Sequence, residues 1–180
     1  TSSAVISVLT GLDPETVTGK GAGLDNAGLK RKIEVIKERN PYPQPGSVRW
    51  DRCFIKSRRT GSGSTGRFLS WLCLLADPGS LDGLITGAAA LAAVKICPEA
   101  AGYLLASHVS AEPAGQAVLS CLGLKAAIQA GMCLGEGTGA AAFFPMLDMA
   151  LTVYSKMDTF QDIKVKPYCH FEEDKNEDNE

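Results

Sequence analysis

Residues 103–113 read Tyr-Leu-Leu-Ala-Ser-His-Val-Ser-Ala-Glu-Pro, and this stretch decides the fold that the sequence predicts. Its apolar first part, Tyr103 to Ala106, predicts a short strand, and a helix is expected from about Glu112 to Cys121. Open α/β sheets bind ligands at the carboxyl ends of their strands, where the following helices begin. The stretch therefore predicts an α/β protein with a ligand site at this strand end, which carries two serines and a histidine.

Helices and short strands alternate along the rest of the chain. An Ala-rich segment follows Leu81-Asp82-Gly83 and ends at Ile96, and its composition predicts a buried helix. Other helices are predicted over residues 2–9, from the Asp13-Pro14 start, over 25–39 and over 138–157. The last is apolar on nearly every side, so we expect it to be buried or at an interface and to bend at Pro145. This alternation favours an α/β fold over an all-α one.

The composition is that of one globular domain of moderate charge. The chain has 180 residues, is 45% hydrophobic and carries a net charge of −2, so its overall charge favours neither a nucleic-acid nor a membrane partner. The six cysteines and two histidines lack zinc-ligand spacing, which predicts reduced thiols in a cytoplasmic protein and no metal site. The first residue is not Met, and we expect the chain to begin inside a larger protein.

Two segments differ in composition from the rest. Residues 166–180 form an acidic tail that we expect to be disordered. Residues 48–79 are rich in Arg and Ser, which leaves a basic RNA-binding arm open as an alternative function. Within them, residues 61–68 imitate a phosphate-binding P-loop, but Arg67 replaces its lysine and Phe68 replaces the hydroxyl that should hold magnesium.

Two glycine-rich loops carry the candidate site. Residues 18–25 alternate glycines with other residues and include a lysine, a pattern that suits a phosphate but also an ordinary tight turn. In the second loop, Glu136 stands between two glycines, just before the apolar helix, where a carboxylate is a candidate general base. The alternative is an acid that suits the start of a helix, with Thr138 as the cap.

These pieces occur in the order of one known family. The chain resembles the C-terminal half of the nicotinate-nucleotide:dimethylbenzimidazole phosphoribosyltransferase family, which makes the lower-ligand nucleotide of cobalamin. The matching segments are residues 12–32, 82–85, 106–113, 134–140 and 157–160. The combination of the 106–113 strand end with the Leu-Gly-Glu-Gly-Thr-Gly-Ala turn is specific to this family.

The resemblance implies a fold, a reaction and a site. The fold would be a Rossmann-like three-layer domain, with a parallel sheet flanked by helices, plus part of a small helical domain. The substrates would be nicotinate mononucleotide and dimethylbenzimidazole, in a cytoplasmic homodimer without a cofactor. Glu136 would be the base that takes the proton of the attacking ring. His108 is open to two interpretations, a donor to the ligand or, more often for such a residue, a structural group that satisfies the strand end. The substrate-binding residues would be Gly21, Gly23, Lys32, Gly83, Ser110 and, for the aromatic base, Leu134.

The chain also departs from the family pattern. The family's N-terminal half is missing, so residues 1–165 would be the C-terminal part of the transferase domain. Residues 48–79 do not match, although the motifs on both sides keep roughly the family's separation. Residues 48–79 have the length that the family has there but a different composition. We therefore form the hypothesis that a compensated frameshift changed this segment. A non-catalytic α/β remnant, which binds a nucleotide or a partner, is therefore the alternative to an active enzyme.

Overall fold

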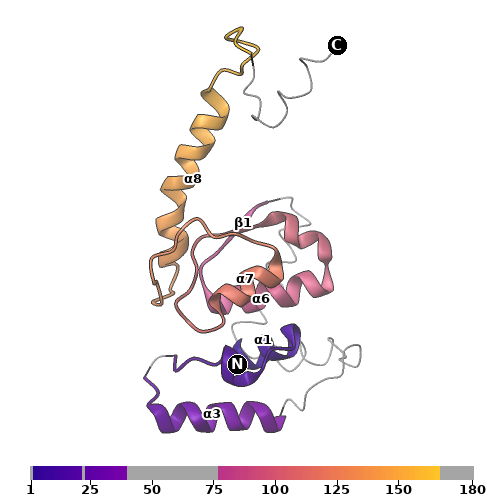
Figure 1. The fold of residues 1–180 in the computed structure, drawn as a ribbon, viewed down its shortest axis with the longest axis vertical. Coiled ribbons are helices and arrows are strands. Elements are labelled where there is room, and N and C mark those ends of the chain that lie inside the picture. The colour runs from indigo at the N-terminus through magenta and orange to yellow at the C-terminus, as the bar shows by residue number, and fades with distance from the viewer. Residues whose placement is uncertain (1, 22, 40–76, 167–180) are drawn as a thin grey trace, which may run out of the picture. The chain divides into compact units, whose positions relative to one another are not determined.

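The computed structural model describes residues 2–21, 23–39 and 77–166 (Figure 1). The chain divides into two compact units, residues 1–144 and 145–180, which are treated separately below. The predictions for most of the 48–79 segment and for the acidic tail therefore lie outside the described residues.

The first unit is built on a parallel strand pair joined by a helical crossover. Strand β1 (Gly79–Leu81) pairs in parallel with β2 (Leu104–Ala106), and Leu81 stands opposite Ala106. Helix α6 (Leu84–Ile96) and the 3-10 helix η2 (Pro98–Tyr103) connect them, because parallel neighbours need a long crossover. The predicted α/β fold with a parallel sheet flanked by helices is thus confirmed in the part of the chain that the structure describes.

Helix α6 is the centre of the core. It contacts α1 (Ser2–Thr10), α7 (Gly115–Leu122), η2 and β1, so little of its surface reaches water. Alanines fill most of its middle, and residues 87–93 are all buried. Figure 1 shows α6 and α7 side by side below β1. The prediction of a buried Ala-rich helix is confirmed, and small side chains are what allow several neighbours to approach it closely.

The segment after α7 extends the sheet. Its backbone runs beside the residues that follow β2, with a parallel bridge between His108 and Ile128. The Ile128 N–H donates to the Ser107 carbonyl at 3.0 Å, and the Val109 N–H donates to the Ile128 carbonyl at 3.0 Å. These bonds hold the polar end of β2 in an extended conformation between β1 and the later segment.

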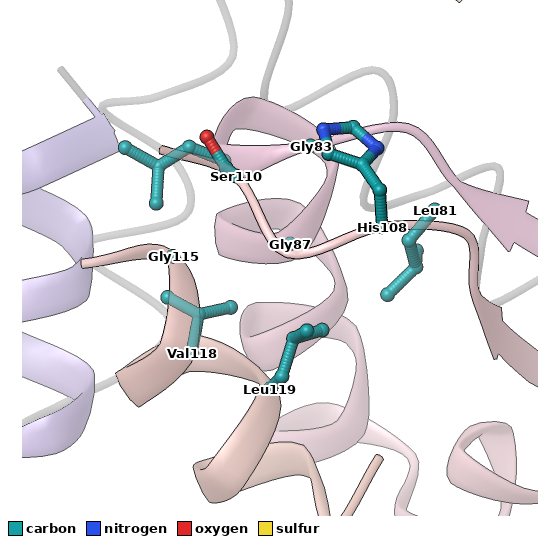
Figure 2. A pocket seen from close by; sticks show the side chains of 9 residues that line it. Leu81, Gly83, Gly87, His108, Ser110, Gly115, Val118 and Leu119 are labelled. Atoms are coloured by element: carbon teal, nitrogen blue, oxygen red, sulfur yellow. The ribbon is translucent and has the colours of Figure 1, made fainter. Parts of the chain in front are cut away.

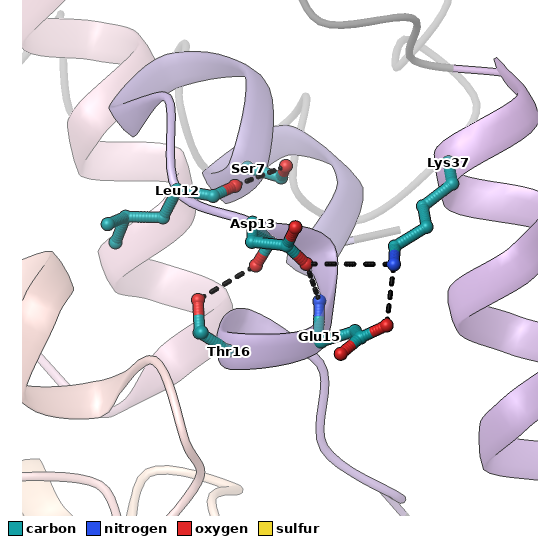
Figure 3. A network of polar contacts seen from close by, with 6 residues as sticks. All are labelled: Ser7, Leu12, Asp13, Glu15, Thr16 and Lys37. Atoms are coloured by element: carbon teal, nitrogen blue, oxygen red, sulfur yellow. Dashed lines mark hydrogen bonds and ion pairs between the residues drawn. The ribbon is translucent and has the colours of Figure 1, made fainter.

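Three helices form the described N-terminal part, and the first of them, α1, packs on the crossover helix α6. Helix α2 (Pro14–Val17) contacts both α1 and α3 (Asn26–Arg39). Asp13 caps α2 by accepting the Glu15 N–H at 2.7 Å, as its sequence predicts. Figure 3 shows Lys37 of α3 reaching this cap, 2.5 Å from Glu15 and 4.0 Å from Asp13. This exposed ion pair ties α3 to α2.

Helix α8 (Thr138–Lys156) begins in the first unit and continues in the second. Its apolar residues Met149, Leu151 and Tyr154 are exposed, so its expected burial is wrong for the described chain, while an interface stays a prediction. Beyond α8, the hydroxyl and backbone N–H of Thr159 bind Asp162 and hold the pKa of that carboxyl below its usual range. None of the described helices has both the length and the apolarity needed to cross a membrane.

One helix begins later than the sequence predicts. Helix α7 starts at Gly115 rather than near Glu112, because residues 111–114 form a turn in which the Glu112 carbonyl accepts the Gly115 N–H at 2.8 Å. Pro113 is typical of the first position of a helix, but here it belongs to that turn. The strand that precedes it starts at Leu104, one residue after the predicted Tyr103.

Replacement of Gly87 by Ala tests the close packing of α6. A Cβ there would lie 2.7 Å from a methyl group of Val118, whose β-branched side chain has little freedom to move. We expect the free energy of unfolding in urea to fall by about 1–3 kcal/mol, although Ala favours helices. Gly102→Ala is the matched control, since nothing lies within 4 Å of its Cβ position. Equal stability of the two variants would contradict this packing.

Candidate functional site

The second glycine loop is attached to the end of β1 through one carboxylate. Asp82 accepts the Gly137 N–H at 2.7 Å with Oδ2, and the Gly139 and Ala140 N–H groups at 2.8 and 3.2 Å with Oδ1. These groups open helix α8, whose first N–H groups lack acceptors within the helix. Thr138 is not their cap, since its hydroxyl donates to the Gly135 carbonyl at 2.7 Å. The cap comes instead from a residue 55–58 positions earlier in the chain.

The backbone at Glu136 is unusual. Its φ is +55°, and the flanking Gly135 and Gly137 have φ of +76° and +83°. The left-handed region costs a non-glycine residue about 1 kcal/mol or more, and such conformations cluster at functional sites. Glu136 is exposed, and Leu134 is 72% exposed. The turn therefore presents the carboxylate outward on a strained backbone that its surroundings must hold.

His108 has a defined hydrogen-bond state on one side of its ring. Ser107 Oγ donates its single proton to the Leu81 carbonyl at 2.5 Å and lies 3.1 Å from His108 Nδ1. Since that proton is already used, Nδ1 must carry the hydrogen of the second bond. The other ring nitrogen, Nε2, is then an acceptor when the ring is neutral. The residue is 5% exposed, which agrees with the structural interpretation of His108.

Two glycines pack against this ring. A Cβ at Gly139 would lie 2.0 Å from His108 Nδ1, and one at Gly83 would lie 3.6 Å from Cε1. The first distance leaves no room for any other residue at 139, so the first turn of α8 rests directly on the imidazole. Together with the Asp82 bonds, this contact fixes the start of α8 in the first unit.

A small pocket opens at the carboxyl end of the strands (Figure 2). Nine residues line it: Leu81, Gly83, Leu84, Gly87, His108, Ser110, Gly115, Val118 and Leu119. Figure 2 shows Ser110 and the His108 ring near Gly83, with Val118 and Leu119 farther down the wall. Its volume of about 10 Å³ is room for roughly one water molecule. The pocket therefore brings Gly83 and Ser110 together in a narrow site.

The first glycine loop approaches the same strand end from another side. Lys32 of α3 donates to the Gly19 carbonyl at 2.7 Å, and its side chain is half-buried. The Cβ position of Gly19 lies 3.0 Å from Pro113, in the turn that follows Ser110. Gly21 and Gly23 have φ of +64° and +87°, which glycine adopts without steric cost. The first loop, which carries Gly21 and Gly23, thus borders the 110–113 turn and is bound at Gly19 by Lys32 of α3.

The predicted site residues fall into three groups. Gly83 and Ser110 share the pocket, Gly21 and Gly23 lie in the first loop, which Lys32 of α3 binds at Gly19, and Leu134 and Glu136 stand on the second loop. In the part of the chain that is described, no three His, Cys, Asp or Glu side chains gather as metal ligands would. The residue that sequence reasoning missed is Asp82. The sequence held only an indirect signal: the residues directly before Thr138 include no Ser, Thr, Asp or Asn to cap the helix, which indicates a distant cap without naming it.

Comparison with known proteins gives one consistent result. The sequence model of a family described as "Phosphoribosyltransferase" matches residues 1–46 and 78–165. Nicotinate-nucleotide--dimethylbenzimidazole phosphoribosyltransferase of Ruminiclostridium cellulolyticum is 41% identical over 171 residues, which are 93% of this chain and 48% of that protein. The protein of the same name from Acetivibrio thermocellus is 38% identical, with the same two shares.

A solved structure shows the same relationship. CobT from Thermus thermophilus aligns with a TM-score of 0.79 and 30% sequence identity, over 93% of this chain and 50% of that one. The chain thus spans about half the length of the curated relatives it matches.

Gly139→Ala tests the contact between α8 and His108. The added methyl group would overlap the ring, so we expect the free energy of unfolding to fall by about 1–3 kcal/mol and the His108 ring signals to shift in NMR spectra. Ala141→Gly, at an exposed position of the same helix, is the control. It should lose about 1 kcal/mol of helix propensity and leave the ring signals in place. Unchanged ring signals in Gly139→Ala would show that the contact is absent.

Proposed function

The chain belongs to the phosphoribosyltransferase family whose sequence model it matches, and on that premise we propose that the whole protein transfers phosphoribose from nicotinate mononucleotide to 5,6-dimethylbenzimidazole. A benzimidazole nitrogen attacks C1′ of the nucleotide, and the bond from C1′ to nicotinate breaks. The configuration at C1′ inverts from β to α, and the N–H proton of the attacking ring passes to a base. The products are nicotinate and α-ribazole 5′-phosphate, for assembly of the cobalamin nucleotide loop.

Glu136 is the base in this proposal. The supporting observation is its exposed carboxylate on a left-handed turn, which Asp82 ties to the end of β1 directly before the pocket residue Gly83. A base held in this way can remain in one position relative to a nucleotide bound at the strand ends. A well-placed general base contributes about 10²–10⁴-fold to a rate. Leu134, two residues earlier, would give the aromatic ring an apolar contact.

The nucleotide's phosphate and ribose would lie against the other two groups of residues. Lys32 has three N–H donors and uses one on the Gly19 carbonyl, so its ammonium can also face a phosphate beside Gly21 and Gly23. Gly83 is the N-cap of α6, and the dipole of that helix favours an anion at its N-terminus. Ser110 supplies a hydroxyl in the same pocket. This arrangement suits a phosphorylated sugar better than an uncharged ligand.

The family resemblance also supports a location, an oligomeric state and a set of partners for the protein. We propose a cytoplasmic homodimer that uses no cofactor and binds neither nucleic acid nor a membrane. Residues 1–165 are taken as the C-terminal part of the transferase domain, followed by the acidic tail. A frameshift across 48–79 is part of the proposal, supported by the interval 47–77 that the family match leaves out. Translation of the gene in the other two frames tests it, and failure to recover an apolar, family-like segment would refute it.

A non-catalytic nucleotide-binding remnant is the second candidate. One observation favours it: the pocket beside Gly83 and Ser110 holds roughly one water molecule. A pocket of that volume can enclose a nucleotide only if its lining residues move or if residues of another segment or chain complete it. Binding without turnover is the property that separates this candidate from the enzyme.

The direct test incubates the chain with nicotinate mononucleotide and dimethylbenzimidazole, and follows binding by calorimetry and products by mass spectrometry. The proposed reaction predicts equal amounts of nicotinate and α-ribazole 5′-phosphate. Nucleotide binding without either product would refute turnover by this chain and support the remnant. Absence of both binding and turnover would contradict both candidates.

Glu136→Gln separates catalysis from binding. Gln has nearly the same shape but cannot take a proton, so turnover should fall by roughly 10²–10⁴-fold while the affinity for nicotinate mononucleotide stays the same. Glu99→Gln, on η2 outside the site, is the control and should change neither quantity. An equal loss of turnover and affinity would mean that Glu136 supports the fold of the turn instead.

A further inference from the structure

The first turn of α8 depends on Asp82 for its hydrogen-bond acceptors. The Thr138 and Ala141 N–H groups donate to the carbonyls of Gly135 and Gly137, at 3.0 and 2.9 Å. The Gly139 and Ala140 N–H groups both donate to Asp82 Oδ1, at 2.8 and 3.2 Å. Two of the four N–H groups at the start of this helix are therefore satisfied by a residue on another element.

The other oxygen of Asp82 acts on the turn itself. Oδ2 accepts the Gly137 N–H at 2.7 Å, and that N–H belongs to the peptide group whose carbonyl comes from Glu136. The bond therefore fixes the orientation of the peptide plane that follows Glu136. A residue at φ of +55° returns to a commoner conformation unless its neighbours hold it. Asp82 is the side chain that binds the backbone on the C-terminal side of this turn.

We propose that Asp82 is a positioning residue that sets the place and backbone conformation of Glu136, and through it the rate of the proton transfer. The proposal rests on the proposed function of Glu136 as the base. Asp82 also stands between Leu81, the last residue of β1, and Gly83 of the pocket. Asp82 thus holds the turn that carries Glu136 at a fixed place relative to the strand end where the nucleotide would bind. A carboxylate suits this role because it offers two acceptor oxygens and no donor.

Asp82→Asn is the test of positioning. The side-chain amide keeps one acceptor and turns a donor toward an N–H group of Gly137 or Gly139, so part of the network is lost. We expect hydrogen exchange of the amides at Gly137, Gly139 and Ala140 to become roughly tenfold faster. The three-bond coupling that reports φ at Glu136 should leave its left-handed value.

Asp13→Asn is the matched control. Asp13 also caps a helix in the first unit, by accepting the Glu15 N–H at 2.7 Å, and Asn is an equally good helix cap. It should leave exchange in the Glu136 turn and the coupling at Glu136 unchanged. Retained protection at Gly137, Gly139 and Ala140 in Asp82→Asn, or a retained coupling at Glu136, would overturn the proposal.

Kinetics test the consequence for the reaction. In Asp82→Asn, kcat should fall roughly 10- to 100-fold, as for a misplaced catalytic group, while KM for nicotinate mononucleotide stays the same. The double variant D82N/E136Q should be no slower than E136Q alone, because Asp82 acts through Glu136. Additive losses would show that Asp82 acts independently and would overturn the proposal.

The measurements separate failure of this inference from failure of the proposed function. Absence of turnover in the unaltered chain would contradict the function, whereas exchange and coupling would still decide whether Asp82 holds the turn. If Asp82→Asn does not fold, hydrogen exchange of the unaltered chain decides instead. The amides of Gly137, Gly139 and Ala140 should be protected, because each donates to the Asp82 carboxylate. Exchange of these amides at the rate of unprotected amides would overturn the proposal.

Discussion

Helix α6 has contacts on nearly all sides, and the rest of the first unit depends on how closely its neighbours can approach it. Its buried run from Gly87 to Ala93 contains, apart from Leu91, only Ala and Gly, and it contacts α1, α7, η2 and β1. Each neighbour packs against a helix surface whose side chains are mostly methyl groups. The distance between α6 and the neighbouring helices and strand is therefore short. A larger residue there would separate the helices from the strand pair, and the strand ends would no longer meet where they do.

Three consecutive residues at the end of β1, Leu81, Asp82 and Gly83, make polar or close contacts with segments that this close packing brings near. The Leu81 carbonyl accepts the Ser107 hydroxyl, which in turn accepts the ring proton of His108. The Asp82 carboxylate holds the Glu136 turn, and Gly83 lines the pocket and opens α6. Segments distant in the sequence are thus connected to one strand end by short polar contacts. The end of β1 is the structural origin of the site more than any of the glycine loops that first draw attention.

The sequence predicted local structure well because its signals are local. Asp13-Pro14 and the Ala-rich segment specify their helices through neighbouring residues, and the structure agrees. The start of α7 was misplaced because Glu112 and Pro113 resemble a helix start while forming a turn before it. The role of Asp82 could not be predicted in the same way, since its partners lie 55–58 positions away and only the parallel pairing brings them together. The exposed apolar side of α8 escaped prediction because periodicity reports hydrophobicity and not what covers it.

The left-handed backbone at Glu136 has an implication for how substitutions at this position would be selected. Glycine adopts such a φ without steric cost, and asparagine tolerates it better than most residues, so either would make the turn more stable than glutamate does. A sequence optimised for stability alone would therefore lose the carboxylate. Under the proposed role of Glu136 as the base, glutamate at this position is a trade-off between stability and activity, in which a small part of the folding free energy is given up to place an acid at the tip of the turn.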